Sequence, residues 1–184
     1  MACSRGSLCH IRSGASFFAD ISFLIPMAKI SRPKTRKFLF QALYSRIHLG
    51  SSFDKETFLD TFFDEEYIGA IDSVYFDEMF AGIISHESEL VAIIEKFAPK
   101  FDVSIMPAGN LLPIFIAAYE MMYLTCDKIP VNVSIDEALE LSKLYSDDKG
   151  RVMINGVLNS LKNSLETVKK EVESSADKKH YFFK

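Results

Sequence analysis

Residues able to bind a charged partner are concentrated between residues 32 and 48. They are basic, amide and aromatic side chains at close spacing: Arg32, Lys34, Arg36, Lys37, Gln41 and Tyr44. At roughly 100° per residue of an α-helix, all of them except Arg32 and Arg36 share one face with His48. The helix dipole disfavours cations near a helix start, so their presence there indicates a negatively charged partner. A merely solvated helix end is the alternative.

A helix over residues 33–48 must hold these side chains in place. Pro33 is tolerated in a first turn because its missing N–H would have no partner there, and Gly50 is a typical residue just beyond a helix end. The other side of the same segment carries an apolar stripe: Leu39, Ala42, Leu43 and Ile47. The spacing therefore predicts a helix with one buried face and one polar, aromatic face.

Two more helices are expected before the middle of the chain. Asp54 and Asp72 are typical N-cap residues and should begin them. The third helix is expected to continue without a break to Phe97, with Gly82 allowing a close approach to a neighbour. Its apolar positions are Val74, Tyr75, Met79, Phe80, Ile83, Leu90 and Ile94. Pro99 and Pro107 then bracket a connector, which predicts a boundary near residues 98–108.

The second half of the chain predicts three more helices. Asn110 should cap a helix over residues 111–125. The next pattern is apolar around so much of its circumference that a central, buried helix is expected: Ile135, Ala138, Leu139, Leu141 and Leu144. Ser134 and Glu137 form a capping box if this helix begins there, or an internal contact if it begins nearer Pro130. After a break at residues 146–150, a last helix should run to about Glu173.

These patterns predict an all-α fold of two packed three-/four-helix subdomains, over about 31–98 and 108–162. No alternating strand pattern is present. Residues 163–184 are expected to form a helix end and a charged, disordered tail. Residues 1–26 differ in composition from the rest, and we interpret them as a non-native or disordered extension before a true start at Met27. A transit-like segment is the alternative; their apolar run is too short to span a membrane.

Charge is distributed unevenly along the 184 residues, whose formal net charge is −4. Residues 27–50 contain six Lys or Arg and no acid, whereas residues 51–96 contain twelve acids and two lysines. One region is therefore suited to bind an anion, and much of the remaining surface would repel it. Apolar residues make up 48% and charged residues 25%, as in ordinary soluble globular proteins.

No catalytic or metal-binding motif is recognisable, so we expect neither an enzyme nor a cofactor. The four histidines are scattered, without a nearby Cys or an H-x-x-x-H pair. No Gly-rich phosphate loop or G-x-S-x-G turn occurs. The three cysteines match no disulfide or zinc framework. Because such thiols are a liability in oxidising compartments, we expect a cytoplasmic protein.

The segments IPVNVSIDEALELSKLY (129–145) and MINGVLN (153–159) closely resemble paired signatures of the NusB family of bacterial transcription antitermination factors. Further matches follow in the family's order over roughly residues 29–162: Gln41–Tyr44, Tyr75–Phe76, Ala81–Ile83 and Ile116–Glu120. The resemblance implies an all-α protein that binds boxA-type RNA together with NusE, a ribosomal small-subunit protein. The complex would help elongating RNA polymerase to read through terminators in ribosomal RNA operons.

The resemblance also implies RNA-binding positions, because cations can follow phosphates while an aromatic ring accepts a base. The candidate set is Arg32, Lys34, Arg36, Lys37, Gln41, Tyr44, Arg151 and Met153. Met153 replaces the usual aromatic and Val152 the usual Lys, which puts a stacking platform in doubt. Asn155 and Gly156 match the family, and we interpret them as a buried amide and a close helix crossing rather than RNA contacts.

A protein–protein adaptor with little RNA affinity of its own is the alternative function. Where the family usually has an Arg, this chain has Phe115, and where it usually has an acid, this chain has Asn110. The lost charges at Phe115 and Val152 and the acidic first helix bundle favour an adaptor, whereas the face of Lys34, Lys37 and Tyr44 favours RNA binding.

Overall fold

The structure is a computed structural model that describes residues 30–62, 70–174 and 181–184; the expected extension 1–26 lies outside these ranges. Helices account for its regular structure: α1 (Arg32–Leu49), η1 (Gly50–Ser52), α2 (Lys55–Phe62), α4 (Ser73–Ser85), α5 (Glu87–Phe97), η2 (Val103–Ile105), α6 (Ala108–Met122), α7 (Val131–Tyr145), α8 (Asp148–Asn163) and α9 (Leu165–Ser174). Within the described ranges there is no strand, and the predicted all-α class is confirmed.

The first helix begins and ends as its sequence predicts. The Ser31 hydroxyl accepts a hydrogen bond from the Lys34 N–H at 3.5 Å, and Pro33 lies in the first turn. Gly50 ends the helix with a φ of 55°, a left-handed conformation that glycine adopts without steric cost. Leu39 and Leu43 are fully buried, so the opposite face of α1 is left at the surface.

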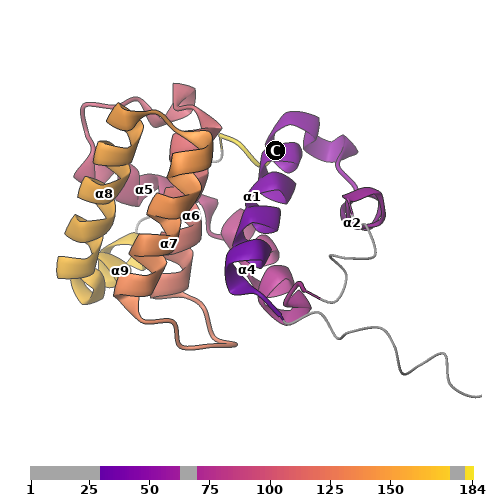
Figure 1. The fold of residues 1–184 in the computed structure, drawn as a ribbon. Coiled ribbons are helices and arrows are strands. Elements are labelled where there is room, and N and C mark those ends of the chain that lie inside the picture. The colour runs from indigo at the N-terminus through magenta and orange to yellow at the C-terminus, as the bar shows by residue number, and fades with distance from the viewer. Residues whose placement is uncertain (1–29, 63–69, 175–180) are drawn as a thin grey trace, which may run out of the picture.

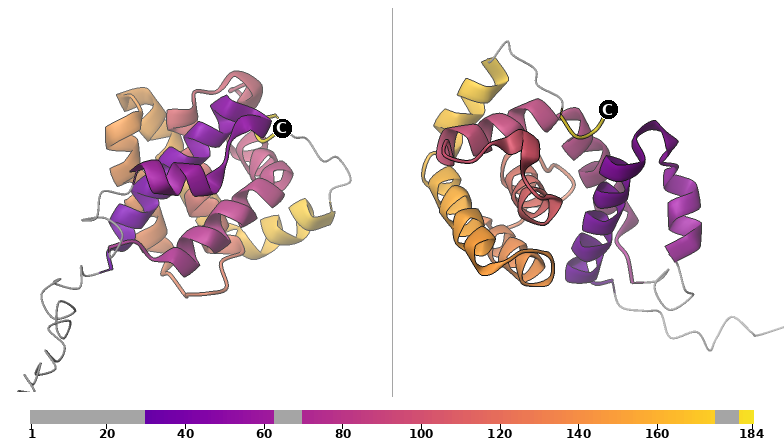
Figure 2. Two further views of the ribbon diagram at one scale, coloured as in Figure 1. Left: turned by 90° about the vertical axis from the view of Figure 1, so that its right-hand side faces the viewer. Right: turned by 90° about the horizontal axis from the view of Figure 1, so that it is seen from above.

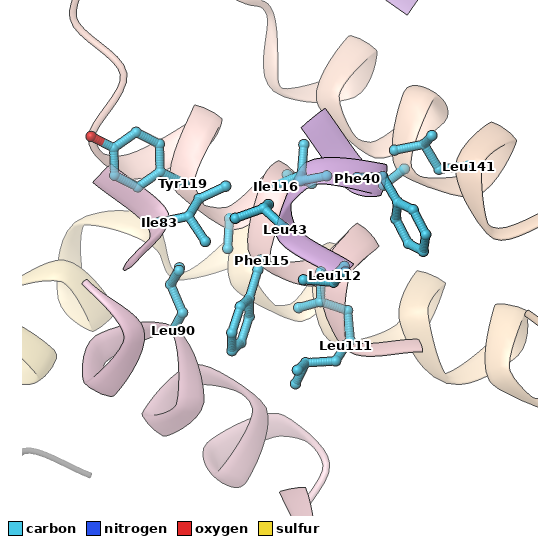
Figure 3. Close-up of a cluster of buried hydrophobic side chains, with 14 of the residues drawn as sticks. Phe40, Leu43, Ile83, Leu90, Leu111, Leu112, Phe115, Ile116, Tyr119 and Leu141 are labelled. Atoms are coloured by element: carbon cyan, nitrogen blue, oxygen red, sulfur yellow. The ribbon is translucent and has the colours of Figure 1, made fainter. Parts of the chain in front are cut away.

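The helices form two packed groups (Figure 1). One contains α1, α2 and α4, and the other contains α5 to α9 (Figure 2). Helix α6 lies on the side of the second group that contacts α1 and α4. Every side chain of α6 from Leu111 to Glu120 is buried. In Figure 3, Leu112 and Phe115 of α6 lie among apolar residues of both groups, including Leu43 of α1 and Leu90 of α5.

The central position belongs to α6 and not to α7, which the sequence predicts as the buried helix. Val133 and Leu144 of α7 are exposed, Leu144 by 61%. Helix α7 begins at Val131, so Ser134 is an internal residue and not an N-cap. Its hydroxyl donates to the Glu120 carboxylate at 2.6 Å. The apolar circumference of α7 reflects contacts with α6 on one side and α8 on another.

Two expected continuous helices are broken. His86 separates α4 from α5 with φ −103° and ψ 21°, and its Nδ1 contacts the Gly82 carbonyl at 2.9 Å. The break turns α5 onto α8 and α9, although the predicted boundary at 98–108 assigns it to the first group. Ser164 similarly separates α8 from α9.

Helices α4 and α6 have some of the local features that their sequences predict and lack others. Asp72 caps α4 by accepting the Tyr75 N–H at 3.0 Å, as predicted. Gly82 allows the predicted close approach, because a methyl group there would overlap the Tyr119 ring. Val74 is exposed instead of buried. Asn110 is not a cap, because α6 already begins at Ala108; its side chain accepts a hydrogen bond from the Ser146 hydroxyl.

The last residues of the chain return to the core, which the predicted disordered tail does not anticipate. Residues 181–184 lie beside the end of α1, and Phe183 is only 8% exposed (Figure 1). Glu87 of α5 accepts the N–H groups of Tyr181 and Phe182 at 2.7 and 2.6 Å. This segment therefore packs against both helix groups.

Candidate functional site

The exposed face of α1 carries most of the side chains that the sequence predicts for binding. Lys34 and Lys37 are exposed, Gln41 is half-buried, and Tyr44 is 44% exposed. Their spacing of three or four residues places them on successive turns of one helix face. A cationic start and an aromatic end therefore lie on a single surface.

Arg36 does not belong to that surface, because it is buried. Its exposed fraction is 3%, and its Nε donates to Oε1 of Glu120 at 2.7 Å. A second contact joins Nη2 to Oε2 of Glu120 at 3.4 Å, and Nη1 lies 3.2 Å from Glu137. Burial alone would lower the pKa of Arg36, but the hydrogen bond and charge of Glu120 outweigh it and raise the pKa. The predicted RNA contact at Arg36 is replaced by a structural ion pair.

The same carboxylate joins four helices of the core. Glu120 of α6 also accepts hydrogen bonds from the Tyr75 hydroxyl of α4 and the Ser134 hydroxyl of α7. Burial and the nearby Glu120 charge raise the pKa of Tyr75, which keeps its hydroxyl protonated as a donor. Buried charges need such partners to be tolerated, so this cluster positions α1 against α4, α6 and α7.

Arg32 is partly exposed but already balanced by acids. Its Nη2 lies 3.0 Å from Asp72 and 3.1 Å from Asp127, and its guanidinium lies 4.4 Å from the centre of the Tyr75 ring. A phosphate at Arg32 would therefore compete with two carboxylates. Lys34 and Lys37 are more exposed than Arg32, so they are the predicted cations of α1 that solvent reaches most easily.

The predicted residues of α8 are divided between the interior and the surface. Met153 is 9% exposed and faces the core, so it is not a stacking platform. Arg151 remains half-exposed and pairs with Asp148. The interpretation of Asn155 and Gly156 as buried is wrong, because both are exposed and nothing lies within 4 Å of a methyl group built on Gly156.

An aromatic column continues the polar face of α1, and two of its four rings, Phe40 and Tyr145, were missed from the sequence. Phe40 stacks on Tyr145 of α7 at 3.9 Å between ring centres, and Tyr44 lies 6.4 Å from Phe40. His48 stacks on Tyr44 at 4.1 Å. The four-residue spacing of positions 40, 44 and 48 was the available signal. Only the fold shows that Tyr145 joins them.

Two hollows extend this surface from α1 across α7 to α8. The first, of about 510 Å³, is lined by Phe40, Gln41, Tyr44, Ser45, Gly109, Leu144 and Tyr145. The second, of about 470 Å³, is lined by Leu139, Lys143, Asp148, Arg151, Val152 and Asn155. Burial raises the pKa of Tyr145, and a hydrogen bond with Gln41 opposes part of that shift. The two hollows share no lining residue, and α7 contributes to both, with Leu144 in the first and Leu139 and Lys143 in the second.

Other kinds of site find little support in the described part of the chain. No group of three or more His, Cys, Asp or Glu in it could hold a metal ion. None of its helices is long and apolar enough to cross a membrane. The arrangement that remains is an extended surface with cations at one end and stacked rings at the other.

Comparison with known proteins decides the family. A model of the NusB family matches residues 33–163. This chain belongs to the NusB family. It is 32% identical over 139 residues to the transcription antitermination protein NusB of Clostridium perfringens (strain ATCC 13124), across 74% of this chain and 100% of that protein. The family resemblance noted in the sequence is thereby confirmed.

Two further NusB proteins support the assignment. The transcription antitermination protein NusB of Limosilactobacillus fermentum is 42% identical over 88 residues, which is 47% of this chain and 62% of that relative, or less than two thirds of its length. The solved structure of T. maritima NusB superposes with a TM-score of 0.61 over 80% of this chain and 99% of that chain. At 24% identity, the superposition establishes the shared NusB fold alone.

Proposed function

We propose that this NusB-family protein is a transcription antitermination factor that binds single-stranded boxA-type RNA. It would do so together with NusE, as part of the elongating RNA polymerase complex in the cytoplasm, and would promote read-through in ribosomal RNA operons. Its role is recognition and not catalysis. The observation that supports this most directly is the single face of α1 on which Lys34, Lys37, Gln41 and Tyr44 follow one another.

Each part of this face has a role in binding unpaired RNA. Lys34 and Lys37 would neutralise phosphates, a contribution that is independent of sequence and sensitive to salt. Gln41 can donate and accept hydrogen bonds at a base edge. Tyr44 and the rings stacked around it would contact unpaired bases. Arg151 would extend the surface onto α8, where the second hollow offers Lys143 and Asn155.

The alternative is an adaptor that binds NusE and has little RNA affinity of its own. Specific observations favour it, since Arg36 is buried, Arg32 is paired with two acids, and Met153 faces the core. These changes leave fewer candidate contacts than the sequence predicts. The adaptor would retain the exposed apolar side chains of Leu144 and Val152 for a protein partner.

Electrophoretic mobility shift with a boxA RNA, with and without NusE, separates the two functions. The RNA-binding proposal expects a shifted band with the protein alone and a tighter one with NusE. A matched RNA with a scrambled boxA element measures specificity. No shift under either condition, with NusE still bound, would leave the adaptor as the better account.

A further inference from the structure

A third hollow, of about 500 Å³, lies on the other side of Tyr44. It is lined by Tyr44, Ile47, His48, Met106, Pro107, Ala108, Gly109, Leu111 and Phe182. Tyr44 and Gly109 also line the hollow shared with Tyr145, so Tyr44 forms a partition between the two. The volume falls within the range of about 300–1,000 Å³ typical of sites for small organic groups.

One wall of this hollow is the last ring of the aromatic column. Tyr44 has His48 stacked on one side and Phe40 on the other. Among the described residues, His48 has Tyr44 as its one ring partner, so its second face is available for stacking. Its Nδ1 lies 2.8 Å from the Tyr44 carbonyl, which can only accept. Nδ1 therefore carries a hydrogen, and Nε2 of the neutral ring is an acceptor.

Phe182 also lines this hollow, and several contacts fix it in place. Oε1 of Glu87 accepts hydrogen bonds from the consecutive backbone N–H groups of Tyr181 and Phe182. The ring of Phe182 lies edge-on to Phe115 of α6, with 6.3 Å between centres. Arg46 Nη1 donates to the Lys184 carbonyl at 3.0 Å, and Phe183 is buried. Residues 181–184 thus provide a wall that α1 alone does not have.

We propose that the hollow between His48 and Phe182 is a slot for one unpaired nucleobase, which stacks on the outer face of His48. This inference rests on the proposed function and assigns it an additional subsite at the end of α1. A base fits better than an apolar protein side chain because the slot continues the stripe of Lys37, Gln41 and Tyr44. The Nε2 of His48 also offers a polar contact that an apolar side chain would leave unsatisfied.

The chain contains no tryptophan, which allows a direct test. In His48→Trp the only indole of the protein lies in the slot. Titration with a boxA RNA should quench the fluorescence of this indole. The RNA concentration at half-maximal quenching should equal the concentration at half-maximal mobility shift. Val133→Trp is the matched control, because Val133 is 41% exposed at the start of α7 and lines none of the three hollows described above. Its fluorescence should not change. A response of His48→Trp to NusE alone, and not to RNA, would identify the slot as a protein contact and overturn the proposal.

Affinities of ring-deleted variants give the second test. His48→Ala and Phe182→Ala should each weaken RNA binding by about tenfold, whereas His48→Phe, which keeps a ring, should stay close to the wild type. Thermal melts show whether each variant is folded. If Lys37→Ala weakens binding and neither His48→Ala nor Phe182→Ala does, the slot is wrong and the RNA-binding function stands. If the wild type binds no RNA even with NusE, both proposals fail.

Discussion

The Arg36 side chain donates to the Glu120 carboxylate at 2.7 Å in the centre of the protein, between α1 and α6. This contact accounts for one of the cations at a helix start, where the helix dipole disfavours positive charge. Arg36 forms a buried ion pair with Glu120, whereas Lys34 and Lys37 of the same helix are exposed to solvent. Basic residues in this segment therefore have two separate roles, which mutations can distinguish.

Arg36→Met should destabilise the protein by about 3–5 kcal/mol, because it leaves the Glu120 charge buried without its main partner. Urea unfolding followed by circular dichroism measures the loss. The double variant Arg36→Met with Glu120→Gln should be more stable than Arg36→Met, since it removes the orphaned charge. Lys37→Met, which removes an exposed cation from the same helix, should stay within about 0.5 kcal/mol of the wild type. A fully stable Arg36→Met would contradict the structural role.

Replacing Lys34 and Lys37 by Ala should weaken RNA binding without weakening NusE binding. Each lost phosphate contact should reduce the slope of log affinity against log salt by about 0.7. Mobility shifts over a series of salt concentrations give this slope. Lys170→Ala, an exposed lysine of α9, is the control and should change neither quantity. Loss of RNA and NusE binding together would show that the two partners share one surface.

Tyr44→Ala should weaken boxA binding by roughly tenfold, the loss expected for one stacked base. Its ring also contacts His48 and Phe40, so a stability loss of about 0.5–1.5 kcal/mol should accompany it. Tyr44→Phe should restore both properties. Tyr44 of α1 lines the same hollow as Gly109 of α6. The competing explanation is that the Tyr44 ring only covers the contact between these two helices. Early melting with normal RNA binding would favour that explanation.

Glu78 should make stability depend on acid pH. Slight burial would raise its pKa, but hydrogen bonds from Cys126 and Thr125 lower it from 4.5 to about 2. Because the folded pKa is the lower one, the stabilisation is present above pH 4.5 and is lost as pH falls toward 2. Glu78→Gln should therefore flatten the decline in melting temperature over this window.

The sequence by itself determined the class of fold and the family. Helix formation and helix ends depend on interactions within a few residues, so local spacing predicts them. Examples are the periodic apolar positions, the N-cap at Asp72 and the helix end at Gly50. The polar face of α1 was predictable for the same reason, because Lys37, Gln41 and Tyr44 share it through helix geometry alone.

Tertiary structure decided which of these residues can meet a partner. Arg36 and Lys37 are adjacent in sequence, yet Glu120, 84 positions from Arg36, draws one inward and leaves the other exposed. The ring contacts of His86 with Tyr119 and the return of Phe182 to Glu87 of α5 likewise depend on partners distant in the chain. The burial of a charged side chain and its ion pair arise only when separate helices pack, and the local pattern does not specify the distant partner.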